Sequence, residues 1–340
     1  MRYIIPTDTS VKEALALLEN NDTQTLFVTD GDGRMKGTLS DGDVRRGMLA
    51  GAAIDSPVSA VMHRDFKYLT QRDFDVRRIR EFRQQRIWLV PVLDADGRIA
   101  DTVNLLKYRS RLPFSAVLMA GGKGERLRPL TEHTPKPLLP VGDKAIIDHN
   151  VDRLLSFGIR DIRVTVNYLA EQIEAHFAEP RDGVTVGCVR ESDFLGTVGS
   201  LRQVRDIPGD TVLVMNSDLF TNIDFEDFYL HFKKYAADLS VAAVPYNVSI
   251  PYGILDLDGR EVKGIVEKPV FNYYAGAGIY LMKREVIGEI PEGQPFHATD
   301  LIQKLVAAGR KVIRYPLNGT WIDIGSLKEY QKACDLVRHL

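Results

Sequence analysis

Residues 118–141 read LMAGGKGERLRPLTEHTPKPLLPV, and this stretch is the most informative part of the sequence. The apolar run 114–119 leads into it and is short enough to form a buried strand. Residues 121–124 (GGKG) follow directly, and glycines let backbone N–H groups approach an anion closely. Free amides followed by Arg126 and Lys136 are groups with which proteins hold polyphosphates. The sequence therefore predicts a phosphate-binding loop at the end of a strand.

The spacing of this loop excludes two common phosphate loops. A Walker loop has Lys-Ser/Thr directly after its last Gly, and a dinucleotide fingerprint has a third Gly where Leu127 stands. The order G-G-x-G-x-R-L-x-P-L-T followed by P-K-P-L-L-P-V resembles the sugar-1-phosphate nucleotidyltransferases, also called nucleotide-sugar pyrophosphorylases. The resemblance covers nearly all of residues 114–335. It implies an α/β fold, a Rossmann-like (GT-A-like) mixed sheet with helices on both faces, and Mg²⁺-assisted nucleotidyl transfer.

Length and composition indicate a soluble enzyme with two domains. The chain has 340 residues, 44% of them hydrophobic, and a net charge of −2 from 44 basic and 46 acidic residues. This balance predicts neither a nucleic-acid partner nor a membrane partner. Cys188 and Cys334 lack metal-ligand spacing, and no segment is apolar enough for a signal peptide or a membrane span. We therefore expect a cytoplasmic protein with free thiols.

Residues 1–110 contain an internal repeat with an offset of 64 residues. LFVTDGDG (26–33) returns as VPVLDADG (90–97), and each copy follows a helical pattern. In both copies an apolar run enters an Asp-Gly turn, which is a hairpin signal. The pattern resembles a tandem pair of cystathionine-β-synthase-type (CBS) domains, which are adenosyl-binding regulatory modules. We expect this small α+β module at residues 1–110 and the nucleotidyltransferase domain at 114–340.

The two CBS-like copies differ at the position that would bind a nucleotide. In the first copy, residues 37–43 resemble an adenosyl-binding signature in which Ser40 meets phosphate and Asp43 accepts from the ribose hydroxyls. Lys107 replaces Asp43 in the second copy. This predicts at most one regulatory adenine-nucleotide site per chain. The alternative is a structural module that pairs two chains in a homodimer, with Asp43 serving as a helix cap.

Residues 114 onward alternate strand-like and helical segments, which predicts a sheet with covered faces. In such a sheet the ligand binds beyond the carboxyl ends of the strands, where the Gly loop falls. The predicted strands are Phe114–Met119, Ile162–Val166, Val184–Val189, Thr211–Met215 and Leu239–Val244, and the predicted helices include Ala145–Phe157 and Phe225–Tyr235.

Two aspartates stand where metal ligands would be useful. Asp218 closes the turn Asn-Ser-Asp after a predicted strand, and Asp323 lies in Trp-Ile-Asp-Ile-Gly. Carboxylate oxygens suit Mg²⁺, which combines one or two of them with phosphate oxygens and water. In the family resembled, an N-x-D turn and a W-x-D-x-G turn supply these ligands. The alternative for each aspartate is a structural turn or cap.

The resemblance also assigns the nucleotide contacts. Arg126 is assigned to the triphosphate and Lys136, placed between two prolines that oppose a helix, to the α-phosphate or the attacking sugar phosphate. Lys123, Arg128 and Lys144 are expected to be surface charges. A carboxylate at Glu191 can accept from N1–H and N2–H₂ of guanine together, which favours GTP as the donor. The full set of expected nucleotide-binding residues is Ala120, Gly121, Gly122, Gly124, Glu191, Gly196 and Thr197.

A second group of residues is assigned to the sugar 1-phosphate by the same resemblance, namely Tyr252, Gly253, Glu267 and Lys268. The family often has N-A-G-I-Y after this lysine, whereas residues 276–280 read GAGIY, so the identity of the sugar stays open. Mannose, glucosamine and N-acetylhexosamine 1-phosphates are the expected acceptors. Uridylyl or thymidylyl transfer to a hexose 1-phosphate is the alternative activity. A further alternative is an inactive nucleotide-binding regulator.

Overall fold

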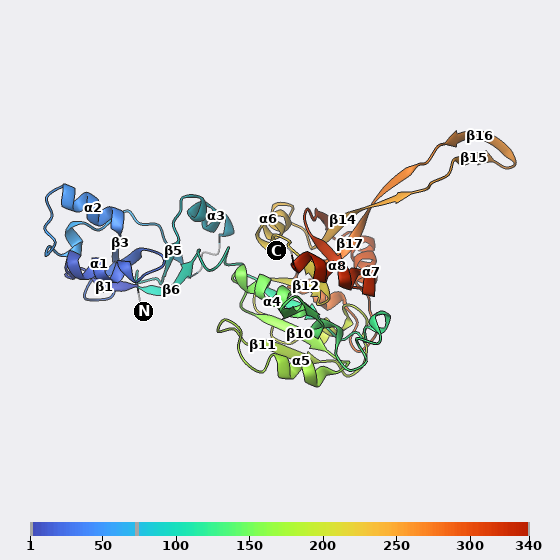
Figure 1. Ribbon diagram of the computed structural model, residues 1–340, viewed down its shortest axis with the longest axis horizontal. Helices are drawn as coiled ribbons and strands as arrows, with labels where there is room; N and C mark the ends of the chain where they lie inside the picture. The colour runs from blue at the N-terminus through green and yellow to red at the C-terminus, as the bar shows by residue number, and fades with distance from the viewer. Residues whose placement is uncertain (1–2, 72–74, 339–340) are drawn as a thin grey trace. The chain divides into compact units, whose positions relative to one another are not determined.

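The computed structural model describes residues 3–71 and 75–338 (Figure 1). The chain forms two compact units. Unit 1 comprises Met1–Leu112 with Ser156–Gly158, and unit 2 comprises Pro113–Leu155 with Ile159–Leu340. Within the two described ranges, no helix is long and apolar enough to cross a membrane.

Unit 1 consists of two copies of one small motif. Each copy has a three-stranded sheet, ordered β1-β2-β3 in the first copy and β4-β5-β6 in the second. Thr25 pairs with Ser40 in the first hairpin, and Leu89 pairs with Asn104 in the second, 64 residues later. The elements are β1 (Ile4–Pro6), α1 (Val11–Glu19), β2 (Thr25–Thr29), β3 (Met35–Ser40), α2 (Asp41–Leu49), β4 (Leu69–Thr70), α3 (Val76–Gln84), β5 (Leu89–Leu93) and β6 (Ile99–Asn104).

The repeat seen in the sequence is therefore a structural repeat. Even the irregularity in the hairpin recurs, between Val28 and Thr29 in one copy and between Val92 and Leu93 in the other. The two sheets share a small core made by Phe27, Met35, Leu89 and Leu93.

The two copies differ after the hairpin. In the first copy β3 leads into α2, whereas in the second copy β6 is followed by a single turn. The side chain of Asn104 accepts from the backbone N–H groups of Leu106 and Lys107 and closes this turn. The second copy therefore lacks the helix that carries Asp43 in the first.

The core of unit 2 is a seven-stranded sheet of order β11-β10-β7-β12-β17-β14-β18. Its first four strands run parallel, β17 runs antiparallel to both neighbours, and β14 runs parallel to β18. This confirms the predicted mixed α/β sheet. The strands are β7 (Ser115–Met119), β10 (Ile162–Val166), β11 (Val186–Arg190), β12 (Thr211–Asn216), β14 (Leu239–Ser249), β17 (Val270–Lys283) and β18 (Val312–Pro316).

The helices of unit 2 pack their apolar stripes against this sheet and its connections. The apolar residues of α4 lie at helical spacing, and Ile147, Val151 and Leu154 are fully buried. The side chain of Asp224 caps α6 by accepting from the N–H of Asp227. The helices are α4 (Ile146–Ser156), α5 (Ala170–His176), α6 (Phe225–Lys234), α7 (Ala298–Ala307) and α8 (Leu327–Val337).

A two-stranded arm extends from the sheet of unit 2 (Figure 1). It consists of residues 244–275: the distal half of β14, the hairpin of β15 (Ile254–Asp258) and β16 (Glu261–Val266), and the first half of β17. β18 accompanies β14 only as far as Ala243. Strand β14 is thus longer than the predicted Leu239–Val244, because its outer part is exposed and shows no apolar run.

Candidate active site

The candidate site begins where two parallel strands end side by side. Met119, the last residue of β7, pairs with Asn216, the last residue of β12. The Gly loop after Met119 and the turn that contains Asp218 therefore start from neighbouring points, as expected for a sheet of this type. The hydroxyl of Ser217 donates to the carbonyl of Met119 at 2.7 Å and ties the turn to the loop.

Glycine is required at two positions of the loop. Gly124 has φ +64, and a Cβ atom there would lie 3.0 Å from the side chain of Thr131 and 3.1 Å from that of Lys136. At Gly121 a Cβ would lie 2.8 Å from Oε1 of Glu191. The loop therefore packs directly against two residues expected to contact the nucleotide.

Lys136 lies in the first position of a short 3₁₀ turn, Lys136–Leu138. The expectation that its flanking prolines prevent helical geometry was wrong, because Pro137 occupies the first turn, where no N–H donor is needed. The ammonium forms an ion pair with Oδ2 of Asp218. Lys136 is thus aimed at the metal-ligand candidate.

The two aspartates meet through a small antiparallel sheet. Strand β13 (Leu219–Thr221) pairs with β19 (Trp321–Asp323), which sets Leu219 opposite Asp323. The N–H of Ile324 donates to the carbonyl of Asp218 at 3.2 Å. Burial, followed by the negative charge of Asp218, raises the pKa of the Asp323 carboxyl, and the cations of Lys136 and Arg126 oppose this shift.

This carboxylate pair fits a magnesium ion. Oδ1 of Asp218 is buried and has no hydrogen-bond partner among the described residues, although its other oxygen meets Lys136. Asp323 is held close enough for the two charges to interact. Residues 3–71 and 75–338 contain no group of three or more His, Cys, Asp or Glu side chains that could hold a metal ion. With two carboxylates as ligands, the remaining coordination positions of the ion would be left to phosphate oxygens and water, which is the arrangement that Mg²⁺ favours.

Glu191 forms the other end of the site. Its side chain is buried, and Oε2 lacks a hydrogen-bond partner in the part of the chain that the structure describes. Burial raises the pKa of this carboxyl, and nearby hydroxyl and amide groups offset the shift only in part. The unpartnered oxygen Oε2 lacks a donor, and a ligand with N–H groups would supply one.

Most of the predicted residues line one pocket of about 660 Å³. Met119, Phe194, Asn216 and Gly325 also line it and were not predicted. Phe194 is an exposed aromatic ring beside Glu191, the type of group on which a base can stack. The predicted residues found in the pocket wall are Ala120, Gly121, Gly122, Gly124, Arg126, Lys136, Glu191, Gly196, Thr197, Asp218 and Asp323.

The positions of Lys123 and Thr197 differ in part from what the sequence predicted. Lys123, expected to be a surface charge, is exposed but lies in the pocket wall, because it belongs to the loop itself. The hydroxyl of Thr197 accepts from the N–H of Ala298, the first residue of α7. Thr197 therefore also caps a helix.

The residues assigned to the sugar phosphate are not in this pocket. Tyr252, Gly253, Glu267 and Lys268 lie on the arm, and none of the arm's residues, all of which are described, lines the pocket. The side chains of Glu267 and Lys268 are 68% and 69% exposed and 3.9 Å apart. The pocket thus contains the expected phosphate, base and metal contacts without the expected sugar contacts.

Asn150, which the sequence did not single out, supports the turn that contains Asp218. It is buried in α4, and its side-chain amide donates to the carbonyls of Ser217 and Leu219, on either side of Asp218. A buried Asn on the apolar face of a predicted helix is the signal that could have identified it.

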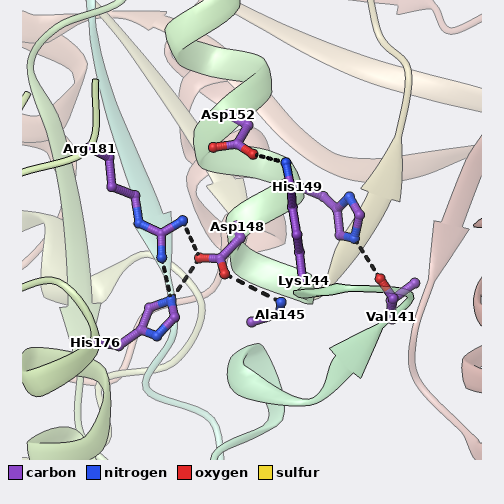
Figure 2. Close-up of polar contacts among 8 residues, drawn as sticks. All are labelled: Val141, Lys144, Ala145, Asp148, His149, Asp152, His176 and Arg181. Atoms are coloured by element: carbon purple, nitrogen blue, oxygen red, sulfur yellow. Dashed lines mark hydrogen bonds and ion pairs between the residues drawn. The ribbon is translucent and has the colours of Figure 1, made fainter. Parts of the chain in front are cut away.

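Helix α4 is itself held by polar contacts at its start (Figure 2). Oδ1 of the buried Asp148 lies 2.7 Å from Nε2 of His176 and 2.9 Å from Nη1 of Arg181. Lys144, expected to be a surface charge, pairs with Asp152 at 2.6 Å. These contacts fix the helix that positions the Asp218 turn.

In unit 1, Ser40 and Asp43 form a capping box at the start of α2. The Ser40 hydroxyl accepts from the N–H of Asp43, while Oδ2 of Asp43 accepts from the N–H and the hydroxyl of Ser40. Oδ1 of Asp43 pairs with Arg46 at 2.6 Å. Both residues therefore have the structural role considered as the alternative, which leaves the regulatory site a prediction.

Comparison with curated proteins finds sugar-phosphate nucleotidyltransferases. A rice (Oryza sativa subsp. japonica) protein named "Probable mannose-1-phosphate guanylyltransferase 1" is 31% identical over 228 residues, which cover 64% of this chain and 63% of that protein. A UTP–glucose-1-phosphate uridylyltransferase of Synechocystis is 31% identical over 241 residues, covering 65% of this chain and 62% of that protein. The chain thus spans less than two thirds of the length of these relatives.

Solved structures share the fold of unit 2. A Bacillus anthracis protein named "Putative Glucose-1-Phosphate Thymidylyltransferase" matches with a TM-score of 0.54 and 26% identity, over 66% of this chain and 96% of that chain. HddC from Yersinia pseudotuberculosis, complexed with GMP-PN, matches with a TM-score of 0.53 and 24% identity, over 66% and 99% of the two chains. At this identity the second match shows the fold alone.

Two family models match the chain in the places expected from its motifs. The CBS domain model matches residues 3–50, within the first copy of the repeat. The nucleotidyl transferase model matches residues 115–339, the whole of the α/β sheet and its pocket. The chain therefore belongs to the nucleotidyl transferase family and carries a CBS domain.

Proposed function

We propose that this protein transfers a nucleoside monophosphate from a nucleoside triphosphate to a sugar 1-phosphate. The observation that carries the proposal is the gathering of Lys136, Asp218 and Asp323 at the mouth of a Gly loop in one pocket. A loop of backbone amides suits the triphosphate, and two carboxylates suit Mg²⁺. The relatives named as guanylyl- and uridylyltransferases support this class of reaction.

The reaction is an in-line displacement at the α-phosphorus. An oxygen of the sugar phosphate forms a bond to the α-phosphorus, and the bond from the α-phosphorus to the bridging oxygen of the β-phosphate breaks, so that pyrophosphate leaves. The attacking phosphate is already ionised at neutral pH, and no general base is needed. Lys136 and Arg126 would hold the two anions together and neutralise the charge on the leaving group. When bound between Asp218 and Asp323, Mg²⁺ would supply further charge neutralisation on the phosphates.

GTP is the proposed donor because of Glu191. Its buried carboxyl can accept from two N–H groups of guanine at once, but from only one N–H of uracil. Uridylyl or thymidylyl transfer is the second candidate. The Gly loop would contact only the phosphates, which all nucleoside triphosphates share, so it would not select the base. The Synechocystis relative is named for UTP. The proposed acceptors are mannose, glucosamine and N-acetylhexosamine 1-phosphates.

The further parts of the proposal concern regulation and assembly. The CBS domain would bind an adenine nucleotide near Ser40 and Asp43 or pair two chains into a homodimer. We place the enzyme in the cytoplasm, with Cys188 and Cys334 as free thiols. An inactive regulator is less well supported, because Asp218, Asp323 and Lys136 are all present in the pocket.

The test is pyrophosphate release over a matrix of four nucleoside triphosphates and several hexose 1-phosphates, with Mg²⁺ present. We expect release to require both substrates and to be fastest with GTP. The Asp218→Asn variant is the control for contaminating activity. Equal rates with UTP would contradict the guanine assignment, and no release with any pair would contradict the proposed reaction.

A further inference from the structure

Residues 109–112, which we call the linker, form the last part of unit 1 before β7 and meet the end of helix α4. The N–H of Arg109 donates to the carbonyl of Ser156 at 2.6 Å, and the N–H of Leu112 donates to the carbonyl of Phe157 at 3.1 Å. Ser156 is the last residue of α4, and the last four carbonyls of a helix have no hydrogen-bond donor within the helix. The linker therefore caps α4 at its C-terminal end.

Gly158 allows the linker to lie directly against the helix end. Its φ is +72, and a Cβ atom there would lie 2.5 Å from the carbonyl oxygen of Ser110 and 2.9 Å from Cα of Arg111. Both are backbone atoms, which cannot turn aside as the end of a flexible side chain can. Ser110 is also fully buried. Any side chain at residue 158 would therefore push the linker away from α4.

The linker is also fixed on its other side, to the last strand of the second CBS-like copy. The N–H of Tyr108, the residue before the linker, donates to the carbonyl of Asn104 at 2.9 Å. Within the linker, Nη1 of Arg111 lies 3.0 Å from Oδ2 of Asp101 in β6. The linker is therefore held between β6 and the end of α4.

Arg153 lies in the last turn of α4, the turn that the linker caps. Its Nε donates to the carbonyl of Ile223 at 2.7 Å, and its Nη2 donates to the carbonyl of Asn222. These two carbonyls directly follow strand β13. Because helices fray from their ends, a loosened last turn would displace this guanidinium before the rest of the helix. The cap on α4 therefore holds Arg153 against the end of β13.

Asn222 connects this contact with both aspartates. It lies four residues after Asp218, and its N–H donates to the carbonyl of Thr320 at 3.1 Å. Its Oδ1 accepts from the N–H of Thr320 at 2.9 Å. Thr320 directly precedes β19, whose last residue is Asp323. By holding Asn222, Arg153 therefore fixes the two strands that bring the carboxylates together.

We propose that the linker is a positioning segment for Asp218 and Asp323, which acts by capping α4 and so keeping Arg153 on Asn222. The inference rests on the proposed function, because it takes the two aspartates as metal ligands. The contacts run from the linker to the last turn of α4, then to Asn222, and from there along β13 and β19. The metal site of unit 2 thus depends on a segment of unit 1.

Hydrogen exchange followed by mass spectrometry tests this inference on the full chain without metal. Gly158→Ala adds the methyl group that the linker backbone cannot accommodate. We expect amide exchange in residues 219–223 and 320–324 to become faster by about ten-fold or more, because both strands lose their support and open more often. Exchange at the wild-type rate in these two segments would overturn the inference.

Gly309→Ala is the matched control for the strain at residue 158. Gly309 has φ +68 and lies two residues after the end of α7, as Gly158 lies two residues after the end of α4. No atom of the described residues lies within 4 Å of the position of its Cβ. The control therefore introduces similar backbone strain at a helix end without displacing another segment. It should leave exchange in residues 219–223 and 320–324 unchanged.

Manganese binding measures the effect on the site itself. Mn²⁺ titration followed by electron paramagnetic resonance, without substrates, should show about ten-fold weaker binding in Gly158→Ala and unchanged binding in Gly309→Ala. Arg153→Met keeps the apolar stem of the side chain, removes the guanidinium and should weaken binding to a similar extent. In the double variant, Gly158→Ala should add nothing to the effect of Arg153→Met, because both interrupt the same series of contacts.

The Arg153→Met variant leaves the linker and Gly158 intact, so it tests the inference independently of strain at the helix end. Wild-type Mn²⁺ affinity in Arg153→Met would overturn the inference. Additive effects of the two substitutions would do the same, because the linker would then act by another route. Neither result would affect the proposed reaction, which stands or falls with pyrophosphate release by the unaltered protein.

Discussion

The side-chain amide of Asn150 donates to the backbone carbonyl of Leu219 at 2.8 Å. The same amide donates to the carbonyl of Ser217 at 3.2 Å, so one residue holds both sides of Asp218. Helix α4, anchored at its start by the contacts of Asp148, thereby fixes the direction of the Asp218 carboxylate. With Asp218 as the proposed metal ligand, Asn150 would affect metal affinity without touching the metal.

The first prediction follows from that contact. Asn150→Leu leaves two carbonyls without their donor and should raise the half-saturating Mg²⁺ concentration by about ten-fold or more. Titration with Mn²⁺, followed by electron paramagnetic resonance on the protein without substrates, measures the effect independently of turnover. Leu154→Ala, on the same helix and fully buried, is the control: it should lower stability by about 2–5 kcal/mol and leave metal affinity unchanged. Equal metal affinity in the wild type and Asn150→Leu would contradict the positioning role.

Asp218 and Asp323 should each be required for turnover. Replacing either with Asn removes one charge from the proposed metal site and should lower turnover by about 10² or more, with the fold nearly unchanged. Because burial and Asp218 raise the pKa of Asp323, the Asp218→Asn variant should also lower the pKa of the Asp323 carboxyl. The measurement is steady-state pyrophosphate release together with thermal unfolding. Near-normal turnover in both variants would exclude them as metal ligands.

Lys136 should depend on its shape as well as on its charge. Lys136→Ala should lose rate, and Lys136→Arg should recover little of it, because a guanidinium is a broad fork and not a compact point charge. Single-turnover kinetics at saturating substrates would measure the chemical step. Full recovery in Lys136→Arg would show that only a positive charge is needed.

Glu191 should control both donor choice and the pH dependence of stability. Glu191→Gln should reduce the preference for GTP over UTP by roughly 1–2 kcal/mol, because a two-point contact to a charged acceptor is weakened. The ratio of kcat/KM values for the two donors measures this. An unchanged ratio would mean that another group recognises the base.

The pH effect of the same variant has a definite sign. Burial raises the pKa of the Glu191 carboxyl, so the folded protein favours the protonated form more than the unfolded chain does. Stability associated with that form is present below the ordinary carboxyl pKa of about 4.3 and is lost as pH rises through the raised value. Thermal unfolding should therefore show Glu191→Gln gaining stability over the wild type as pH increases. A constant difference across this range would mean that the carboxyl is not desolvated.

The fifth prediction concerns the CBS domain. Calorimetric titration with AMP, ADP and ATP should detect one site, which Asp43→Ala should abolish. Since Asp43 belongs to a capping box, the substitution should also lower stability by about 1 kcal/mol. Glu13→Ala removes the equivalent box of α1 and is the matched control that should retain binding. If none of the three nucleotides releases heat with the wild type, only the structural role remains.

Much of the fold was visible in the sequence because buried elements have strong patterns. The strand Ile162–Val166 was predicted with its observed bounds, and the repeat offset of 64 residues reappears in the hairpin registers. The outer part of β14 and the whole of β17 and β18 were missed. The outer halves of β14 and β17 face solvent on both sides, so no buried face imposes an alternation on their residues, whereas the inner half of β17 is buried in the sheet.

The candidate site likewise has parts that the sequence predicts and parts that it does not. The Gly loop, Asp218 and Asp323 were predictable because their chemistry requires particular residues in a particular order. Asn150 was not, because its role arises from a contact between segments that are distant in sequence. The residues expected to contact the sugar phosphate were chosen by resemblance. The length and direction of the arm decide which groups these residues can reach, and a short sequence motif predicts neither.

The pairing of Leu219 with Asp323 has a consequence for the order in which the protein matures. The Gly loop after Met119 and the Asp218 turn emerge from the ribosome well before Trp321–Asp323. Closing so long a loop is slow compared with forming local structure. A growing chain therefore has its Gly loop before it has Asp323, and the proposed two-carboxylate site is completed only when β19 joins β13, among the last steps of its biogenesis.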